Sequence, residues 1–142
     1  MRTLGFASGW LVRPGYADLV EFLHGYDLPV VLHSCGGITD AVPLIVQAGF
    51  DGLNPMEAKA GCDTLRFAEQ YGDQLAFFGG LDARILESVD RERIRQGTEN
   101  LVNGMKARGA RYVFGSDHSI STNVRYADFC YAIEVYREHM MY

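Results

Sequence analysis

The chain has 142 residues, of which 48% are hydrophobic and 22% charged, and its formal net charge is -5. This composition is typical of one globular domain over residues 1–142, and the scattered Lys and Arg residues argue against a nucleic-acid partner, which requires clustered positive charge. No apolar run approaches the roughly 18 to 20 residues that span a bilayer, so we expect no membrane partner and a cytoplasmic location.

A helix is predicted over about residues 16–26, with Leu19, Val20, Phe22 and Leu23 on its buried side. Four short apolar runs follow, each succeeded by a longer segment with helical periodicity. Continuous apolar character is typical of parallel strands that are covered on both faces. The runs are PVVLH (29–33), FDGLN (50–54), LAFFGG (75–80) and RYVFG (111–115).

Capping residues and glycines mark the helices that follow these strands. Thr39 is the expected cap of the second helix, which Gly49 ends, and Asp90 and Gly109 delimit a helix over about residues 90–108. The remaining helices are predicted over about 63–71 and from about 123 to the C-terminus.

A helix followed by four β-α units is an α/β chain with two possible architectures. Right-handed crossovers allow an open doubly wound sheet or a part of a barrel. Because a (β/α)8 TIM barrel takes roughly 250 residues, four units correspond to about half of one.

Polar and glycine residues follow each predicted strand. In parallel α/β folds the chemistry gathers at the C-terminal strand ends, so we expect these residues on one rim. The candidate catalytic residues are His118, Asp117 and Glu57, and the candidate substrate-binding residues are Gly79, Gly80, Asp82 and Ser116.

His33-Ser34-Cys35 is the most specific of these patterns. Residues two apart in an extended strand point to the same side, so His33 and Cys35 can reach one zinc ion. His118 is the leading candidate for a third ligand, with Asp117, Glu57 and Cys62 behind it.

An alternative for each of these residues is a purely structural role. Buried cysteine is often inert core, which is the expected role of Cys130, and Asp82 is also placed to cap the helix behind it. His24 and His139 lie on helices away from the rim, and no chemistry is assigned to them.

From residue 29 onward the chain resembles the C-terminal half of the uroporphyrinogen decarboxylase superfamily. The resemblance lies in VVLHSCGGITDAVPLIVQAGFDGLNPMEAKAGCD, LAFFGGLDARIL and YVFGSDHSISTNVRYADFCYAIE, in this order and spacing. It implies the C-terminal half of a (β/α)8 TIM barrel with four parallel strands.

The superfamily has two branches with different chemistry. One decarboxylates uroporphyrinogen without metal; the other uses zinc, held by a His-x-Cys pair and a distant Cys, to move methyl groups between a corrinoid protein and a thiol acceptor. His33 and Cys35 resemble the methyltransferase pair, whereas His118, at about the distant cysteine's place, resembles the decarboxylases. Residues 79–82 match both branches.

The resemblance therefore implies zinc held by His33, Cys35 and His118, with Glu57 or Asp117 as an orienting partner or fourth ligand. The corrinoid would be carried by a partner protein. One alternative is a tetrapyrrole-binding or decarboxylating domain, although that branch's pyrrole-binding aspartate and carboxylate-binding arginines belong to the N-terminal half. Another is a non-catalytic or truncated half-barrel that forms a homodimer or pairs with an N-terminal half-barrel partner, because its sheet edges would be open.

Overall fold

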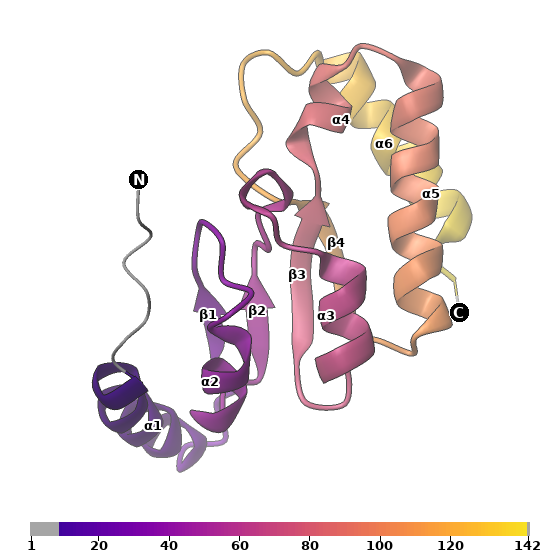
Figure 1. Ribbon diagram of the computed structural model, residues 1–142. Helices are drawn as coiled ribbons and strands as arrows, with labels where there is room; N and C mark the ends of the chain where they lie inside the picture. Colours follow the sequence, from indigo (N-terminus) through magenta and orange to yellow (C-terminus); the bar gives the residue numbers. More distant parts are fainter. Residues whose placement is uncertain (1–8, 142) are drawn as a thin grey trace.

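The computed structural model describes the backbone of residues 9–141 and the side chains of residues 15–141. Helices and strands alternate along the chain (Figure 1). They are α1 (Gly9–His24), β1 (Val31–His33), α2 (Val42–Gln47), β2 (Gly52–Asn54), the 3-10 helix η1 (Ala58–Ala60), α3 (Thr64–Tyr71), β3 (Ala76–Leu81), α4 (Ala83–Glu87), α5 (Arg91–Ala107), β4 (Tyr112–Ser116) and α6 (Tyr126–His139).

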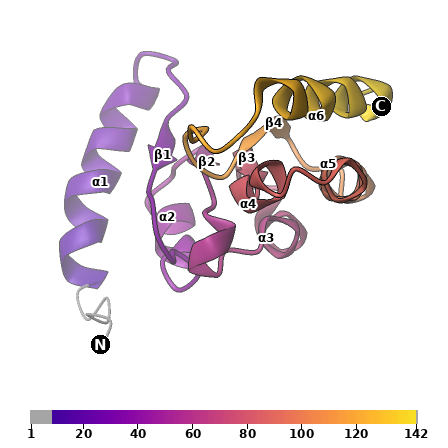
Figure 2. The same ribbon diagram turned by 90° about the horizontal axis from the view of Figure 1, so that it is seen from above.

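The strands form one parallel sheet in the order β1-β2-β3-β4, which is their order in the sequence. The register places His33 of β1 beside Asn54 of β2. Viewed along the strands, α1, α2, α3, α5 and α6 lie in an arc around one side of the sheet (Figure 2). This is the architecture of half a (β/α)8 barrel, as the sequence predicts.

The two faces of the sheet differ sharply in burial. Leu53 and Phe77 are fully buried on the face that the helices cover. The opposite face would line the barrel interior, and there Val31 is 41% exposed and Val113 is 53% exposed. Parallel sheets are normally covered on both faces, so this sheet lacks a covering layer on one of its faces.

Side-chain caps start two of the predicted helices. Asp63 accepts a hydrogen bond from the Arg66 backbone N–H, and Asp90 accepts hydrogen bonds from those of Glu92 and Arg93. The predicted cap at Thr39 is wrong. The Ile38 carbonyl accepts instead from the Ala41 and Val42 N–H groups, so the turn before α2 is closed by backbone alone.

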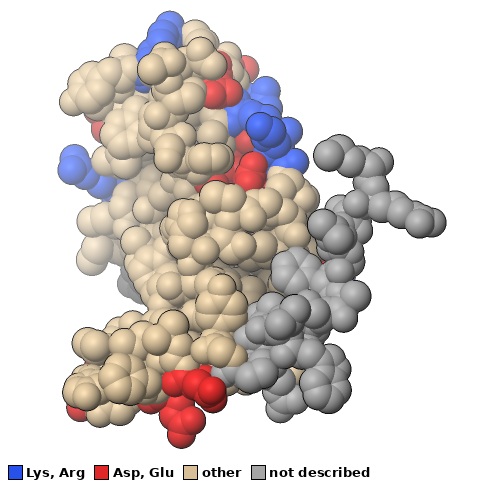
Figure 3. Space-filling view, turned by 90° about the vertical axis from the view of Figure 1, so that its left-hand side faces the viewer, with Lys and Arg blue, Asp and Glu red and all other residues tan. Residues whose placement is uncertain are grey.

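The prediction for the first helix needs two corrections. The helix begins at Gly9 rather than near residue 16. Val20 is buried, but Leu19 and Phe22 are 48% and 60% exposed, because α2 and the residue Phe50, which precedes β2, cover only one side of α1. The side of the molecule that carries α1 and β1 has few charged side chains over much of its described surface (Figure 3).

Within residues 9–141, no helix combines the length and apolar character that a membrane crossing requires.

Candidate functional site

The β-α loops meet at the C-terminal ends of the strands, the upper rim of the sheet in Figure 1. His33 is the last residue of β1, and Cys35 lies two residues further on, so the strand delivers both side chains to this rim. Both are exposed on the open side of the sheet.

Asn54, at the end of β2, contacts the ring of His33. The Asn54 Oδ1 atom lies 2.6 Å from His33 Nδ1, and the Asn54 amide nitrogen donates to the Phe78 carbonyl at 2.9 Å. A carbonyl cannot donate, so the Asn54 nitrogen must face Phe78 and its oxygen must face His33. His33 therefore carries its proton on Nδ1.

This tautomer leaves a lone pair on His33 Nε2. The Cys35 Sγ atom lies 3.5 Å from that nitrogen. A neutral imidazole nitrogen and a cysteine sulfur, side by side, are two of the ligand types that zinc prefers. A histidine that binds a metal through one ring nitrogen usually donates the N–H of the other to an acceptor oxygen, and Asn54 Oδ1 is such an acceptor for His33.

His33, Cys35 and His118 all line one cavity of about 250 Å³, together with Asn54, Pro55, Ser116 and Ser119. The structure thus brings the end of β1 and the loop after β4 to one cavity. Asn54 was missed, although its place at the end of the FDGLN run, at the level of His33, is a signal that could have indicated it.

His118 has the opposite tautomer. Its Nδ1 atom accepts a hydrogen bond from the Ser119 backbone N–H at 2.7 Å. A neutral ring then carries its proton on Nε2, which leaves no free lone pair for a metal. His33 and Cys35 thus fit zinc, whereas His118 in this conformation offers a hydrogen-bond donor.

No three His, Cys, Asp or Glu side chains within the described part of the chain are arranged to hold a metal ion together. The His33–Cys35 pair would therefore supply two ligands. The remaining coordination positions would be open to a bound molecule or to other donors.

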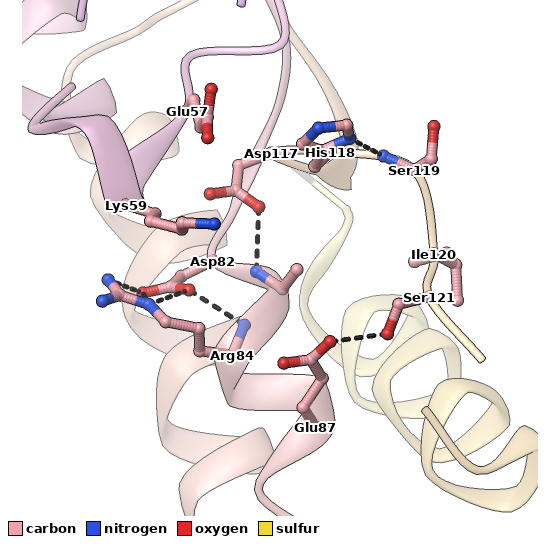
Figure 4. A pocket seen from close by; sticks show the side chains of 11 residues that line it. Glu57, Lys59, Asp82, Arg84, Glu87, Asp117, His118, Ser119, Ile120 and Ser121 are labelled. Carbon is pink, nitrogen blue, oxygen red and sulfur yellow. Dashed lines mark hydrogen bonds and ion pairs between the residues drawn. The ribbon is translucent and has the colours of Figure 1, made fainter. Parts of the chain in front are cut away.

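A second cavity, of about 590 Å³, adjoins the first and shares His118 and Ser119 with it. Figure 4 shows its lining, to which the loops after β2, β3 and β4 contribute. Its ionisable residues are the carboxylates Glu57, Asp82, Glu87 and Asp117, the cations Lys59 and Arg84, and His118.

Asp117 ties three of the rim loops together. It is almost completely buried; one carboxylate oxygen accepts from the Ala58 N–H and the other from the Ala83 N–H, each at 2.9 Å. Its predicted place on the rim is confirmed. Because both Asp117 oxygens accept hydrogen bonds from backbone amides, the geometry favours a role in positioning the loops over a role in proton transfer or metal binding.

Glu57 and Cys62 hold the loop that follows Cys35. The Glu57 carboxylate accepts from the Gly36 N–H at 2.8 Å, and the buried Cys62 thiol donates to the Gly36 carbonyl at 3.4 Å. Neither side chain lines the cavity that contains His33. Gly36, the residue next to Cys35, is thereby held at both its backbone N–H and its carbonyl.

Gly79 and Gly80 allow close packing of neighbouring backbone and side chains. Gly79 has φ +106°, and a Cβ there would lie 2.7 Å from the Ser116 carbonyl oxygen, whereas a Cβ at Gly80 would lie 2.6 Å from Thr64 Oγ1. The protein itself fills the space beside both glycines. Ser116 does line the smaller cavity.

Asp82 caps α4 and pairs with Arg84. It accepts from the Arg84 backbone N–H at 2.9 Å, and its carboxylate contacts the Arg84 guanidinium at 2.6 Å. The Arg84 hydrogen bonds hold the pKa of Asp82 below its ordinary value of 3.8. Asp82 lines the larger cavity, but its charge is already matched by Arg84.

The comparison with protein families agrees with this fold. Residues 10–139 match the family described as uroporphyrinogen decarboxylase (URO-D). The chain therefore belongs to the uroporphyrinogen decarboxylase family. A search of the curated proteins finds no match.

Proposed function

We propose that this domain binds zinc through His33 and Cys35 and serves methyl transfer from a corrinoid protein to a thiol acceptor. The observation that carries the proposal is the 3.5 Å approach of Cys35 Sγ to His33 Nε2, with the other ring nitrogen held by Asn54. Zinc at this pair would act as a Lewis acid that keeps an acceptor thiol deprotonated near neutral pH.

Each residue of the site has a defined task in this proposal. His33 would hold the zinc ion through its Nε2 lone pair, and Cys35 would bind it as a thiolate after losing its thiol proton to solvent. His118 presents its Nε2–H to the cavity as a donor to the anionic sulfur of the acceptor, rather than as the third ligand that the sequence suggests. Glu57 fixes the loop after Cys35.

The transfer itself involves only the acceptor and the corrinoid. The corrinoid of the partner protein would supply the methyl group and keep the electron pair of the broken bond, and the acceptor sulfur would form the new bond to the methyl carbon. The acceptor's proton passes to solvent when the thiolate forms. The chain's residues position the sulfur and stabilise its charge.

The decarboxylase alternative has less support. Uroporphyrinogen carries many carboxylates, and the larger cavity is lined by four acidic side chains against two cationic ones, of which Arg84 is already paired with Asp82. Such a lining repels a polyanionic substrate.

We further propose that a half-barrel partner covers the open face of the sheet. The exposure of Val31 and Val113 supports this proposal, because both strands lie at sheet edges. A second copy is the less favoured partner. The two helices α1 and α6 already flank the edge strands, so a second copy would bring two helices to each junction where a barrel has one (Figure 2).

Zinc content tests the proposed site directly. After incubation with zinc and removal of the excess, we expect about one zinc ion per chain, and its loss in both His33→Ala and Cys35→Ala. Cys130→Ala and His139→Ala are the matched controls, because both residues lie on α6 and should leave zinc content unchanged. Absence of zinc from the wild-type chain, or its retention in both site variants, would contradict the proposal.

A further inference from the structure

The end of β2 lacks one hydrogen bond that a regular sheet would have. The Ala76 N–H donates to the Asp51 carbonyl, and pairing of β2 with β3 continues only to Leu53 and Phe77. In a parallel ladder the next donor to the Phe78 carbonyl would be the backbone nitrogen at position 55. That residue is Pro55, which has no N–H.

The Asn54 side chain takes the place of the missing donor. Its amide nitrogen donates to the Phe78 carbonyl at 2.9 Å, which fixes the orientation of the amide group. The amide oxygen then points across to β1, where it meets His33 Nδ1 at 2.6 Å. The hydrogen bond that Pro55 cannot make thus determines which way the Asn54 amide faces, and its oxygen is directed toward His33 at the end of β1.

We propose that Asn54 is a positioning residue that locks His33 in the Nδ1–H tautomer and keeps the Nε2 lone pair beside Cys35 Sγ. The lock is a property of the protein without metal. Its consequence for zinc affinity rests on the proposed function. Loss of such a supporting hydrogen bond to a metal-binding histidine typically lowers metal affinity about 10- to 100-fold.

Two substitutions distinguish the role of Asn54 as a hydrogen-bond acceptor from its role as a donor. Asn54→Leu removes the acceptor of the His33 proton at similar volume, whereas Asn54→Asp keeps an acceptor oxygen but cannot donate to Phe78. Asn103→Leu, on the exposed surface of α5, is the control for an asparagine-to-leucine change elsewhere. Circular dichroism checks that each variant is folded.

The tautomer is read from nitrogen NMR of the zinc-free chain with 15N-labelled histidine, assigning His33 by its loss in His33→Ala. We expect the Nδ1–H form of His33 in the wild type, in Asn54→Asp and in Asn103→Leu. In Asn54→Leu we expect the Nε2–H form or a mixture of the two. A merely structural role of Asn54 would leave this spectrum unchanged.

Zinc affinity is measured in parallel by competition with a chelating dye. We expect about a 10- to 100-fold loss in Asn54→Leu, and most of the affinity to return in Asn54→Asp. If Asn54→Leu is unfolded, the comparison of wild type with Asn54→Asp still tests whether an acceptor without the Phe78 hydrogen bond suffices for the tautomer.

The proposal is overturned if wild-type His33 is not in the Nδ1–H form, or if that form persists in folded Asn54→Leu. A shifted tautomer with unchanged zinc affinity also overturns it, because the lock would then not position a ligand. If the wild type takes up no zinc, the proposed function fails, while the NMR spectra still decide whether Asn54 sets the tautomer.

Discussion

Asp117 shows how one carboxylate can organise a rim of loops. Its two oxygens accept from the backbone amides of Ala58 and Ala83, which begin η1 and α4. A hydrogen bond to a charged acceptor contributes more to the free energy of unfolding than one to a neutral acceptor. A buried N–H group without an acceptor destabilises the fold. The loops that follow β2 and β3 therefore depend on a residue that follows β4.

Replacing Asp117 by Ala should destabilise the chain markedly. Two backbone N–H groups would lose their acceptor in a buried setting, at a total cost of about 2–4 kcal/mol in the free energy of unfolding. Urea denaturation followed by circular dichroism measures the change. Asp73→Ala, at an exposed aspartate, should cost less than about 0.5 kcal/mol. Equal stabilities of the two variants would contradict this role of Asp117.

Strands β3 and β4 approach closely where Gly79 lies. The glycine has φ +106°, and its missing Cβ leaves room for the carbonyl oxygens of Ser116 and Pro55, at 2.7 and 3.0 Å from where that atom would be. A side chain at this position would push apart the strand that carries Ser116 and the loop that begins at Pro55. The spacing of these elements therefore requires glycine.

Gly79→Ala should consequently lower the stability of the fold much more than alanine at another glycine with a positive φ angle. Gly61 has φ +91°, and no atom lies within 4 Å of the place that a methyl carbon would take there, so Gly61→Ala should cost only the backbone strain, about 1–2 kcal/mol. Gly79→Ala adds a steric clash, and we expect at least about 2 kcal/mol more. Thermal unfolding of both variants makes the comparison; similar losses would show that close packing does not explain Gly79.

Local signals in the sequence predicted most of the elements. The apolar runs located the four strands, and the caps at Asp82 and Asp90 act as expected, because these depend on residues near one another in the chain. Thr39 failed as a cap because the Ile38 carbonyl closes the turn first. Burial of Leu19 and Phe22 failed because it depends on which other elements surround α1.

The sequence could predict which residues meet at the site, because these residues follow the ends of parallel strands, but it could not predict the hydrogen bonds within the site. His33, Cys35 and His118 line one cavity, as their positions after parallel strands indicate. The tautomers of the two histidines are set by Asn54 and by the Ser119 N–H, and such hydrogen bonds follow from register and ring orientation. No pattern in the sequence specifies them.

At the scale of the whole molecule, the open face of the sheet is the feature to explain. Val31 and Val113 lie on it, and α1 adds the exposed side chains of Leu19 and Phe22 at the β1 edge. Exposed sheet edges and apolar surface favour association with another chain. The placement of α1 and α6 favours a complementary half-barrel over a second copy.

Light scattering of the purified chain should therefore show no discrete dimer. We expect a molar mass near 15.8 kDa at low concentration and a gradual, heterogeneous rise at higher concentration. Val31→Lys should change the free energy of unfolding by less than about 0.5 kcal/mol, since the residue is already exposed. A dimer mass that is constant with concentration and abolished by Val31→Lys would contradict this view.

X-ray absorption spectroscopy of the zinc-loaded chain tests the central claim most directly. The account predicts one sulfur neighbour of zinc at about 2.3 Å and at least one imidazole nitrogen at about 2.0–2.1 Å. The sulfur contribution should disappear in Cys35→Ser and persist in Cys62→Ser. Zinc surrounded only by nitrogen and oxygen in the wild-type chain, or a sulfur signal that survives Cys35→Ser, would contradict it.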